Sequence, residues 1–240
     1  MLAPAQATSA PAAYVRLSVA RGTAQPSVSH QKIRSTGPTD EEPAEFALIA
    51  DALRAAAHAA RSGIAVTERP APSRVAPFGI AFGAAVPAQP ATVDAEAPEL
   101  GAGRLVVLHD PAGQPAWDGA YRVACYARAA LDLEMVTDPV LPAVTWSWLE
   151  EALASRAAAA ELLAGTVTTT AASRFGSLAR EGDTFEVELR CSWSPRWTPD
   201  DAGSHLDAFV VLLGTMAGLP PDDDPSVVSL ASRARTGGAG

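Results

Sequence analysis

Apolar residues recur along the chain with two different periods. Three segments repeat them every three to four positions, the spacing of one helix face: residues 40–63, 145–165 and 198–217. In the first, Phe46, Ile49 and Leu53 mark the buried stripe. In the second, Ser147 with Glu150 has the spacing of a capping box at a helix start. The sequence therefore predicts three amphipathic helices.

Other segments alternate apolar and polar residues, or are short apolar runs, as strands do. They are residues 75–86, 104–108, 121–129, 166–175 and 185–193, the first of them irregular. In 121–129, Tyr121, Val123 and Cys125 fall on one face, and Arg122 and Tyr126 on the other. Hairpins separated by helices predict an α+β fold of order α-(β)-ββ-α-ββ-α. We expect an antiparallel sheet of four to five strands from two hairpins, covered on one face by three helices.

The two ends of the chain differ in composition from the middle. Residues 1–39 and 222–240 are rich in small and polar residues without a period, so we predict a disordered N-terminal extension and a disordered C-terminal tail. A single domain is expected over 40–221. Within it, Pro, Ala and Gly dominate residues 87–103, which predicts a loop or flexible linker.

Charge and composition exclude several functions. The net charge of −9 disfavours contact with a phosphate backbone, so a DNA-binding role is not expected. Lys32 is the only lysine among 18 basic residues, and it lies in the predicted extension. This argues against Schiff-base, pyridoxal phosphate and P-loop chemistry, and we expect no cofactor. The apolar run 208–219 is too short to span a bilayer. With two cysteines and no secretion signal at the first residues, we expect a cytoplasmic protein.

Several unusual strings carry a family resemblance. They are GRLVVLHDPAGQPAWDG (103–119), WSWLEEAL (146–153), GTVTTTAASRFG (165–176), ELRCSW (188–193) and AGLPP (217–221). In this order they resemble an actinobacterial family, the domain of unknown function numbered three thousand, over roughly 40–221. The resemblance implies a cytosolic protein of actinobacterial origin. It brings no activity and no catalytic residue.

One turn-rich segment is a candidate for chemistry. His109, Asp110 and Asp118 place an imidazole and two carboxylates between two predicted strands, where they could serve as a general base or a weak metal site. The alternative is a hairpin loop in which Asp, Pro and Gly serve turn geometry, and we favour it. The inward-facing Cys125 and Cys191 lack the local spacing of a zinc site, so no metal site is predicted and buried free thiols are expected.

Two further groups of residues are candidates for binding. The outward sheet face carries Tyr126 among arginines, a combination that holds RNA or other anions, although Glu186 and Glu188 on the same face suggest cross-strand ion pairs. These arginines are Arg122, Arg128, Arg174 and Arg190. The corner after the last strand carries Trp193, Arg196 and Trp197, which could stack a ligand, anchor a partner or simply pack.

The motif survey favours binding over catalysis. No nucleophile elbow, HExxH helix or GxGxxG turn is found in the sequence. We expect a non-enzymatic cytosolic adaptor that recognises a protein or an anionic ligand. A small hydrolase or lyase centred on the His109–Gly119 segment, and an RNA-associated accessory protein, are the alternatives.

Overall fold

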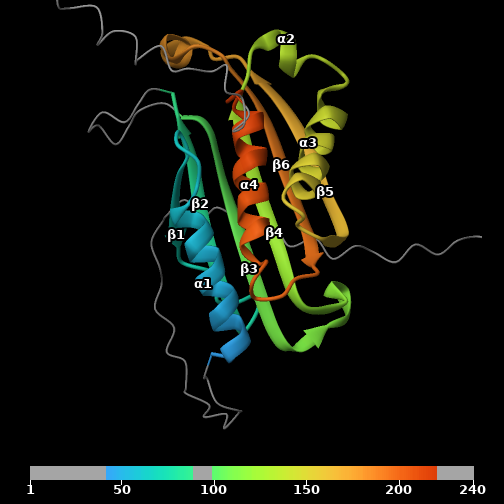
Figure 1. Cartoon of the computed structure of the whole chain (residues 1–240). Helices are drawn as coiled ribbons and strands as arrows, with labels where there is room; N and C mark the ends of the chain where they lie inside the picture. The colour runs from blue at the N-terminus through green and yellow to red at the C-terminus, as the bar shows by residue number, and fades with distance from the viewer. Residues whose placement is uncertain (1–41, 89–98, 221–240) are drawn as a thin grey trace, which may run out of the picture. The chain divides into compact units, whose positions relative to one another are not determined.

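The structure is a computed structural model and describes residues 42–88 and 99–220. The predicted extension (1–39), the predicted tail (222–240) and residues 89–98 of the predicted linker lie outside the described residues. The described residues belong to one compact unit, and its helices and strands are shown in Figure 1.

Six strands form a single open sheet in the order β1-β2-β3-β4-β6-β5, and every neighbouring pair is antiparallel. The strands are β1 (Ala65–Arg69), β2 (Phe78–Pro87), β3 (Glu99–Gln114), β4 (Gly119–Ala130), β5 (Ala160–Ala172) and β6 (Thr184–Pro195). The helices of the described residues are α1 (Ala44–His58), α2 (Leu133–Val136), α3 (Leu141–Ser155) and α4 (Gly203–Met216), with 3₁₀ turns η1 (Pro115–Trp117) and η2 (Gly176–Glu181). The α+β class and the antiparallel sheet are confirmed.

The strand and helix counts and the linker prediction need correction, because the described residues form six strands and four α-helices, against the four to five strands and three helices predicted. The edge strand β1 was not predicted, because its five residues AVTER are mostly exposed and bury no alternating face. The predicted linker ends too late, because β3 already begins at Glu99. Gly101 and Gly103 of β3 have no side chains where α4 packs directly on the strand, and a Cβ at Gly103 would lie 2.9 Å from the ring of Phe209. The small residues that permit this close packing also give the segment the composition of a linker.

Both ends of the second predicted helix also differ from the prediction. Helix α3 begins at Leu141, so Ser147 lies inside it and donates to the Val144 carbonyl instead of capping the helix. The predicted continuation to residue 165 is wrong, because Ala157 adopts a left-handed φ of 53° and β5 begins at Ala160. An alanine-rich sequence fits a helix or a strand, and sheet pairing decides between them.

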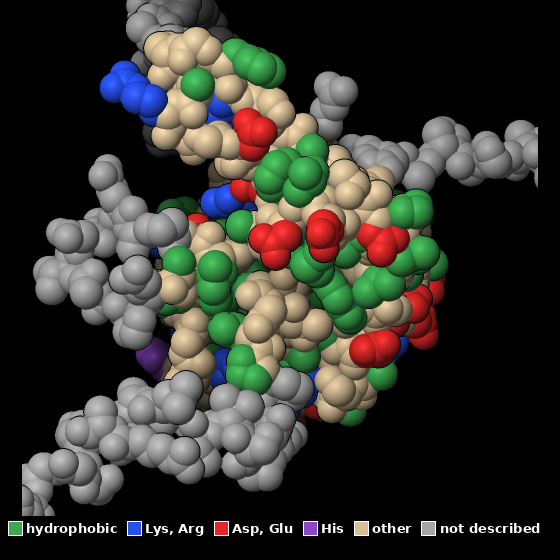
Figure 2. All heavy atoms as spheres, turned by 90° about the horizontal axis from the view of Figure 1, so that it is seen from above, with side chains coloured by type: hydrophobic (Ala, Val, Ile, Leu, Met, Phe, Trp, Pro, Cys, Tyr) green, Lys and Arg blue, Asp and Glu red, His purple; other side chains and the backbone are tan. Residues whose placement is uncertain are grey.

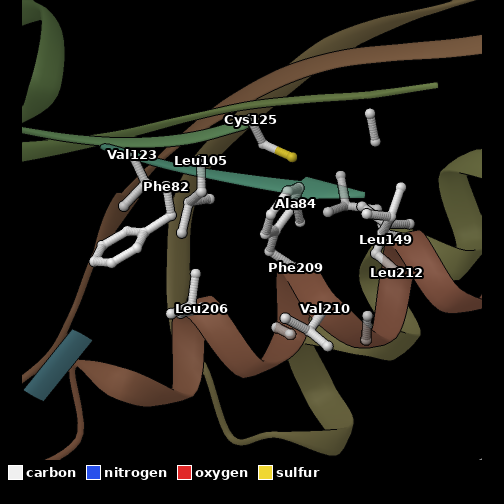
Figure 3. Close-up of a cluster of buried hydrophobic side chains, with 14 of the residues drawn as sticks. Phe82, Ala84, Leu105, Val123, Cys125, Leu149, Leu206, Phe209, Val210 and Leu212 are labelled. Carbon is white, nitrogen blue, oxygen red and sulfur yellow. The ribbon is translucent and has the colours of Figure 1, made fainter. Parts of the chain in front are cut away.

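The main core lies between the sheet and helices α1, α3 and α4, which cover one face (Figure 1). In the close-up of Figure 3, Leu206 and Phe209 of α4 point toward Phe82, Leu105 and Val123 on the sheet. All five side chains are almost fully buried, and burying each contributes roughly 1.5–3 kcal/mol. The apolar residues that recur with helical and strand periods in the sequence therefore pack together in this layer.

A smaller cluster covers part of the opposite face. The chain between β1 and β2 folds over it, so that Ala76 packs with Val106, Leu108 and Trp117. No described helix covers the remainder of that face (Figure 1). We call it the open face.

Candidate functional site

The two segments that the sequence analysis identified as candidates meet at one end of the sheet. The η1 turn lies between β3 and β4, and the chain leaving β6 passes beside it. Ser194 donates a hydrogen bond from its hydroxyl to the Trp117 carbonyl, and the guanidinium of Arg196 pairs with Asp118 at 3.0 Å. Segments that are 78 residues apart in sequence therefore build one site.

A hollow of about 200 Å³ opens between these segments and the first turn of α1. We call it the sheet-end pocket. Its polar lining comes from three parts of the chain. These are Glu45 from α1, Asp118 just before β4 with Tyr121 inside it, and Ser194, Arg196 and Trp197 from the end of β6 and beyond.

An array of aromatic rings runs beneath the pocket. His109 stacks between Phe46, with centroids 5.4 Å apart, and Tyr121, at 4.3 Å. Tyr121 contacts Trp197 edge-on at 5.5 Å, and Trp197 contacts His205 of α4 at 5.0 Å. These ring contacts position Tyr121 and Trp197, the two members of the array that line the pocket.

His109 is placed as a packing residue and not as a general base. It lies inside β3, on the helix-covered side, and is only 5 % exposed. Its Nδ1 lies 3.2 Å from the carbonyl of Ala120, which assigns the ring proton to that nitrogen. Burial lowers the pKa of His109, so the ring is neutral at physiological pH.

The carboxylates of the same segment are also committed. Asp110 accepts hydrogen bonds from the Ala112 amide at 3.1 Å and from the Gln114 side chain at 3.0 Å, as the turn interpretation predicts. Asp118 faces Arg196 instead of His109. The structure thus does not assemble the three catalytic candidates into an acid–base pair.

Two buried hydrogen-bonding groups at the pocket have no partner. Tyr121 Oη and Trp197 Nε1 are both buried and unpaired among the described residues. Burial, with a smaller contribution from Glu45, raises the pKa of Tyr121 to about 12, so its hydroxyl keeps its proton. Glu45 itself is exposed and forms no ion pair within the described residues. Unpaired buried donors cost roughly 1–3 kcal/mol each, so they call for an explanation.

Trp193 does not belong to the accessible surface. It is 1 % exposed and donates from Nε1 to Nδ1 of His205 at 3.0 Å. Burial lowers the pKa of His205 to about 4, so this imidazole is a neutral acceptor. Of the three candidates at this corner, Arg196 and Trp197 line the pocket and Trp193 does not.

The open face carries most of the predicted arginines, and acids pair with two of them. Arg128 contacts Glu186 at 3.1 Å and Glu99 at 3.5 Å. Arg190 pairs with Glu188 and lies over the ring of Tyr126, 4.9 Å from its centroid. The cross-strand ion pairs suggested by the sequence are therefore present at Arg128, whereas Arg190 and Glu188 pair within β6.

Two of the predicted arginines have structural partners. Arg122 donates to the hydroxyls of Ser192 and Ser194, and burial lowers its pKa. Arg174 lies beyond the end of β5, where it bonds the Gly182 carbonyl and pairs with Glu181 at 3.5 Å. It is held in the turn before β6 and does not line the open face with the others.

The two cysteines lie side by side. Cys125 of β4 is directly opposite Cys191 of β6, and both are buried free thiols. A hydrogen bond between them, together with burial, raises the pKa of Cys125 well above its usual value. Within residues 42–88 and 99–220, no three His, Cys, Asp or Glu side chains are grouped to hold a metal ion.

Some residues of interest were missed by the sequence reasoning. Tyr121 was assigned to the inward face, but its unpaired hydroxyl depends on contacts from α1 and the 197 corner. Glu45 lies on the first turn of α1, and no local pattern indicates its role. Arg104 was grouped with the continuous apolar run 104–108, although its alternation with Leu105 places it on the open face.

Comparison with known families decides where the chain belongs. The model of a protein family of unknown function, DUF3000, matches residues 42–227. The chain belongs to this family. The match covers every described helix and strand, so the sheet-end pocket lies within the DUF3000 region. No curated protein and no solved structure matches the chain.

The DUF3000 description names no activity, and the site must therefore be interpreted from its own geometry. In the part of the chain that the structure describes, no helix is long and apolar enough to cross a membrane.

Proposed function

We propose that this DUF3000 chain is a non-enzymatic binding domain that holds a small polar ligand in the sheet-end pocket. One observation carries the proposal: Tyr121 and Trp197 line the pocket, and the Oη of the first and Nε1 of the second are buried and lack partners among the described residues. A bound molecule that satisfies both groups removes an energetic cost that the free domain has to bear.

The unpaired groups define the chemistry of the ligand. An indole N–H is only a donor, so it requires an acceptor such as a carbonyl or carboxylate oxygen. Glu45 is a free carboxylate at the rim and favours an ammonium or hydroxyl group. Arg196 contributes little free charge because it is already paired with Asp118 and Glu161. A small zwitterion, which carries an oxygen acceptor and an ammonium group, fits this lining best.

The other candidate functions receive less support. A hydrolase or lyase needs an accessible base, and His109 is buried and stacked between two rings. An RNA-binding role was expected to need an arginine face free of acids, and Arg128 and Arg190 are paired with glutamates. The actinobacterial origin implied by the resemblance and the cytoplasmic location indicated by the cysteine content both stay predictions.

Thermal unfolding of the full chain with a panel of small molecules tests the proposal. The panel contains α-amino acids, the matching primary amines and the matching carboxylic acids. A ligand present at 100 times its Kd stabilises the domain by about 2.7 kcal/mol, which raises Tm by roughly 5–10 °C at this size. We expect amino acids to give a larger shift than either single-charge series.

Matched variants tie the effect to the pocket. Tyr121→Phe removes an unpaired hydroxyl, so the free variant should be as stable as the wild type or more stable while binding is weakened. Trp197→Phe should also weaken binding. Tyr126→Phe and Trp148→Phe, which alter the same residue types away from the pocket, should leave it unchanged. Equal shifts from all four variants, or no stabilisation by any member of the panel, would rule the proposal out.

A further inference from the structure

A second hollow lies on the open face, toward the opposite end of β3 from the sheet-end pocket. Its volume is about 430 Å³, and it spans β1, β2 and β3. The lining that matters for chemistry is Thr67, Arg69, Gly83, Glu99 and Arg104. Neither of these arginines was a candidate from the sequence, and the hollow does not depend on the function proposed for the sheet-end pocket.

The two arginines are brought together by strand register. Gly83 lies directly opposite Arg104 in the β2–β3 pair and opposite Thr67 in the β1–β2 pair. The side chain of Arg69 lies over Gly83, because a Cβ built there would be 3.3 Å from the Arg69 Nε. Both arginines therefore border the same patch of sheet, and Gly83 has no side chain that would displace Arg69 from it.

Neither charge is neutralised. Within the described residues, Arg69 has no carboxylate partner, and Arg104 donates only to the carbonyl of Pro70. Arg104 Nε is buried and has no partner at all among these residues. The acid that borders the hollow, Glu99, is already paired with Arg128. Two unmatched cations side by side are unfavourable in the free protein, and an anion between them removes the repulsion.

We propose that this hollow is an oxyanion site that takes the phosphate group of a small ligand. Guanidinium forks match the oxygen geometry of phosphate, and two of them balance its double charge. The Thr67 hydroxyl supplies a further donor at the edge. Arg104 Nε gains a partner, and the Arg104 guanidinium keeps its bond to Pro70, which holds it in place.

Titration of the full chain with inorganic phosphate at constant ionic strength tests the site, followed through backbone amide shifts by nuclear magnetic resonance. We expect saturable shifts at Thr67, Gly83 and Arg104. Arg69→Ala and Arg104→Ala should each weaken binding by about tenfold or more, since each removes a charge-assisted contact. Arg190→Ala removes the same charge from the same face, but its guanidinium is already paired, so binding should change by less than about twofold.

The outcomes are separable. Sulfate that competes with phosphate supports an oxyanion site, and acetate that competes equally well would assign it to carboxylates and overturn the phosphate proposal. Amide shifts that follow total salt instead of phosphate would indicate nonspecific electrostatic attraction. Phosphate binding that weakens as much in Arg190→Ala as in Arg69→Ala would indicate the same, and either result would overturn the proposal. Arg69 is exposed, so its variant should fold even if Arg104→Ala does not. Loss of binding in Arg69→Ala is independent of the Tyr121 and Trp197 variants, which should bind phosphate normally.

Discussion

The buried pair of Trp193 and His205 should make the stability of the domain depend on pH. His205 accepts the Trp193 indole N–H at Nδ1, so the neutral ring has its proton on Nε2. Protonating Nδ1 would break this bond and place a charge in the core. The substitution His205→Asn keeps an acceptor oxygen near the Nδ1 position and removes the titration.

The magnitude follows from the pKa difference between the two states. The pKa of His205 is lowered to about 4 in the fold, against the usual 6.5, chiefly by burial. Below pH 6.5 the unfolded chain binds a proton that the folded chain does not, so stability is lost as the pH falls toward 4. It is fully present above 6.5. At about 1.4 kcal/mol per pKa unit, the loss amounts to roughly 3 kcal/mol.

Urea unfolding between pH 4 and 8 measures this loss. The wild type should lose roughly 3 kcal/mol more than His205→Asn between pH 7 and pH 4. The comparison between variants matters because His109 and Asp207 also have shifted pKa values and contribute in both proteins. His58→Asn, at an exposed position of α1, should follow the wild type. Parallel curves for wild type and His205→Asn would refute the reasoning.

Two further predictions concern packing. Gly103→Ala places a methyl group 2.9 Å from an aromatic ring of α4 and should lower the free energy of unfolding in urea by about 1–3 kcal/mol. Gly119→Ala, where the added methyl group meets no atom within 4 Å, should be close to neutral. Equal losses in the two variants would contradict the close approach of α4. Cys125 and Cys191 should react with a thiol reagent only after unfolding, because both are buried and the thiolate of Cys125 is disfavoured. Immediate labelling of the native protein would show that these cysteines face solvent instead of the core.

The sequence by itself determined which faces of the main elements are buried. Phe46, Ile49 and Leu53 recur at helical spacing, and Val123 and Cys125 alternate with polar residues, because burial on one face requires those periods. The hairpin spacing gave the antiparallel pairing of β3 with β4 and of β5 with β6. These features are local, so a single sequence contains them.

Only the tertiary structure decided where the sites lie. Asp118 meets Arg196, Glu45 lies beside Tyr121, and Arg69 and Arg104 border the same hollow at Gly83, so each site joins distant segments. Their adjacency depends on the order of strands in the sheet and on how α1 packs, and a helical or strand period carries no information about either. The burial of His109 shows the same limit. Its residue type suggests a catalytic base, but the rings of Phe46 and Tyr121, supplied by other elements, exclude the water and charge that a base requires.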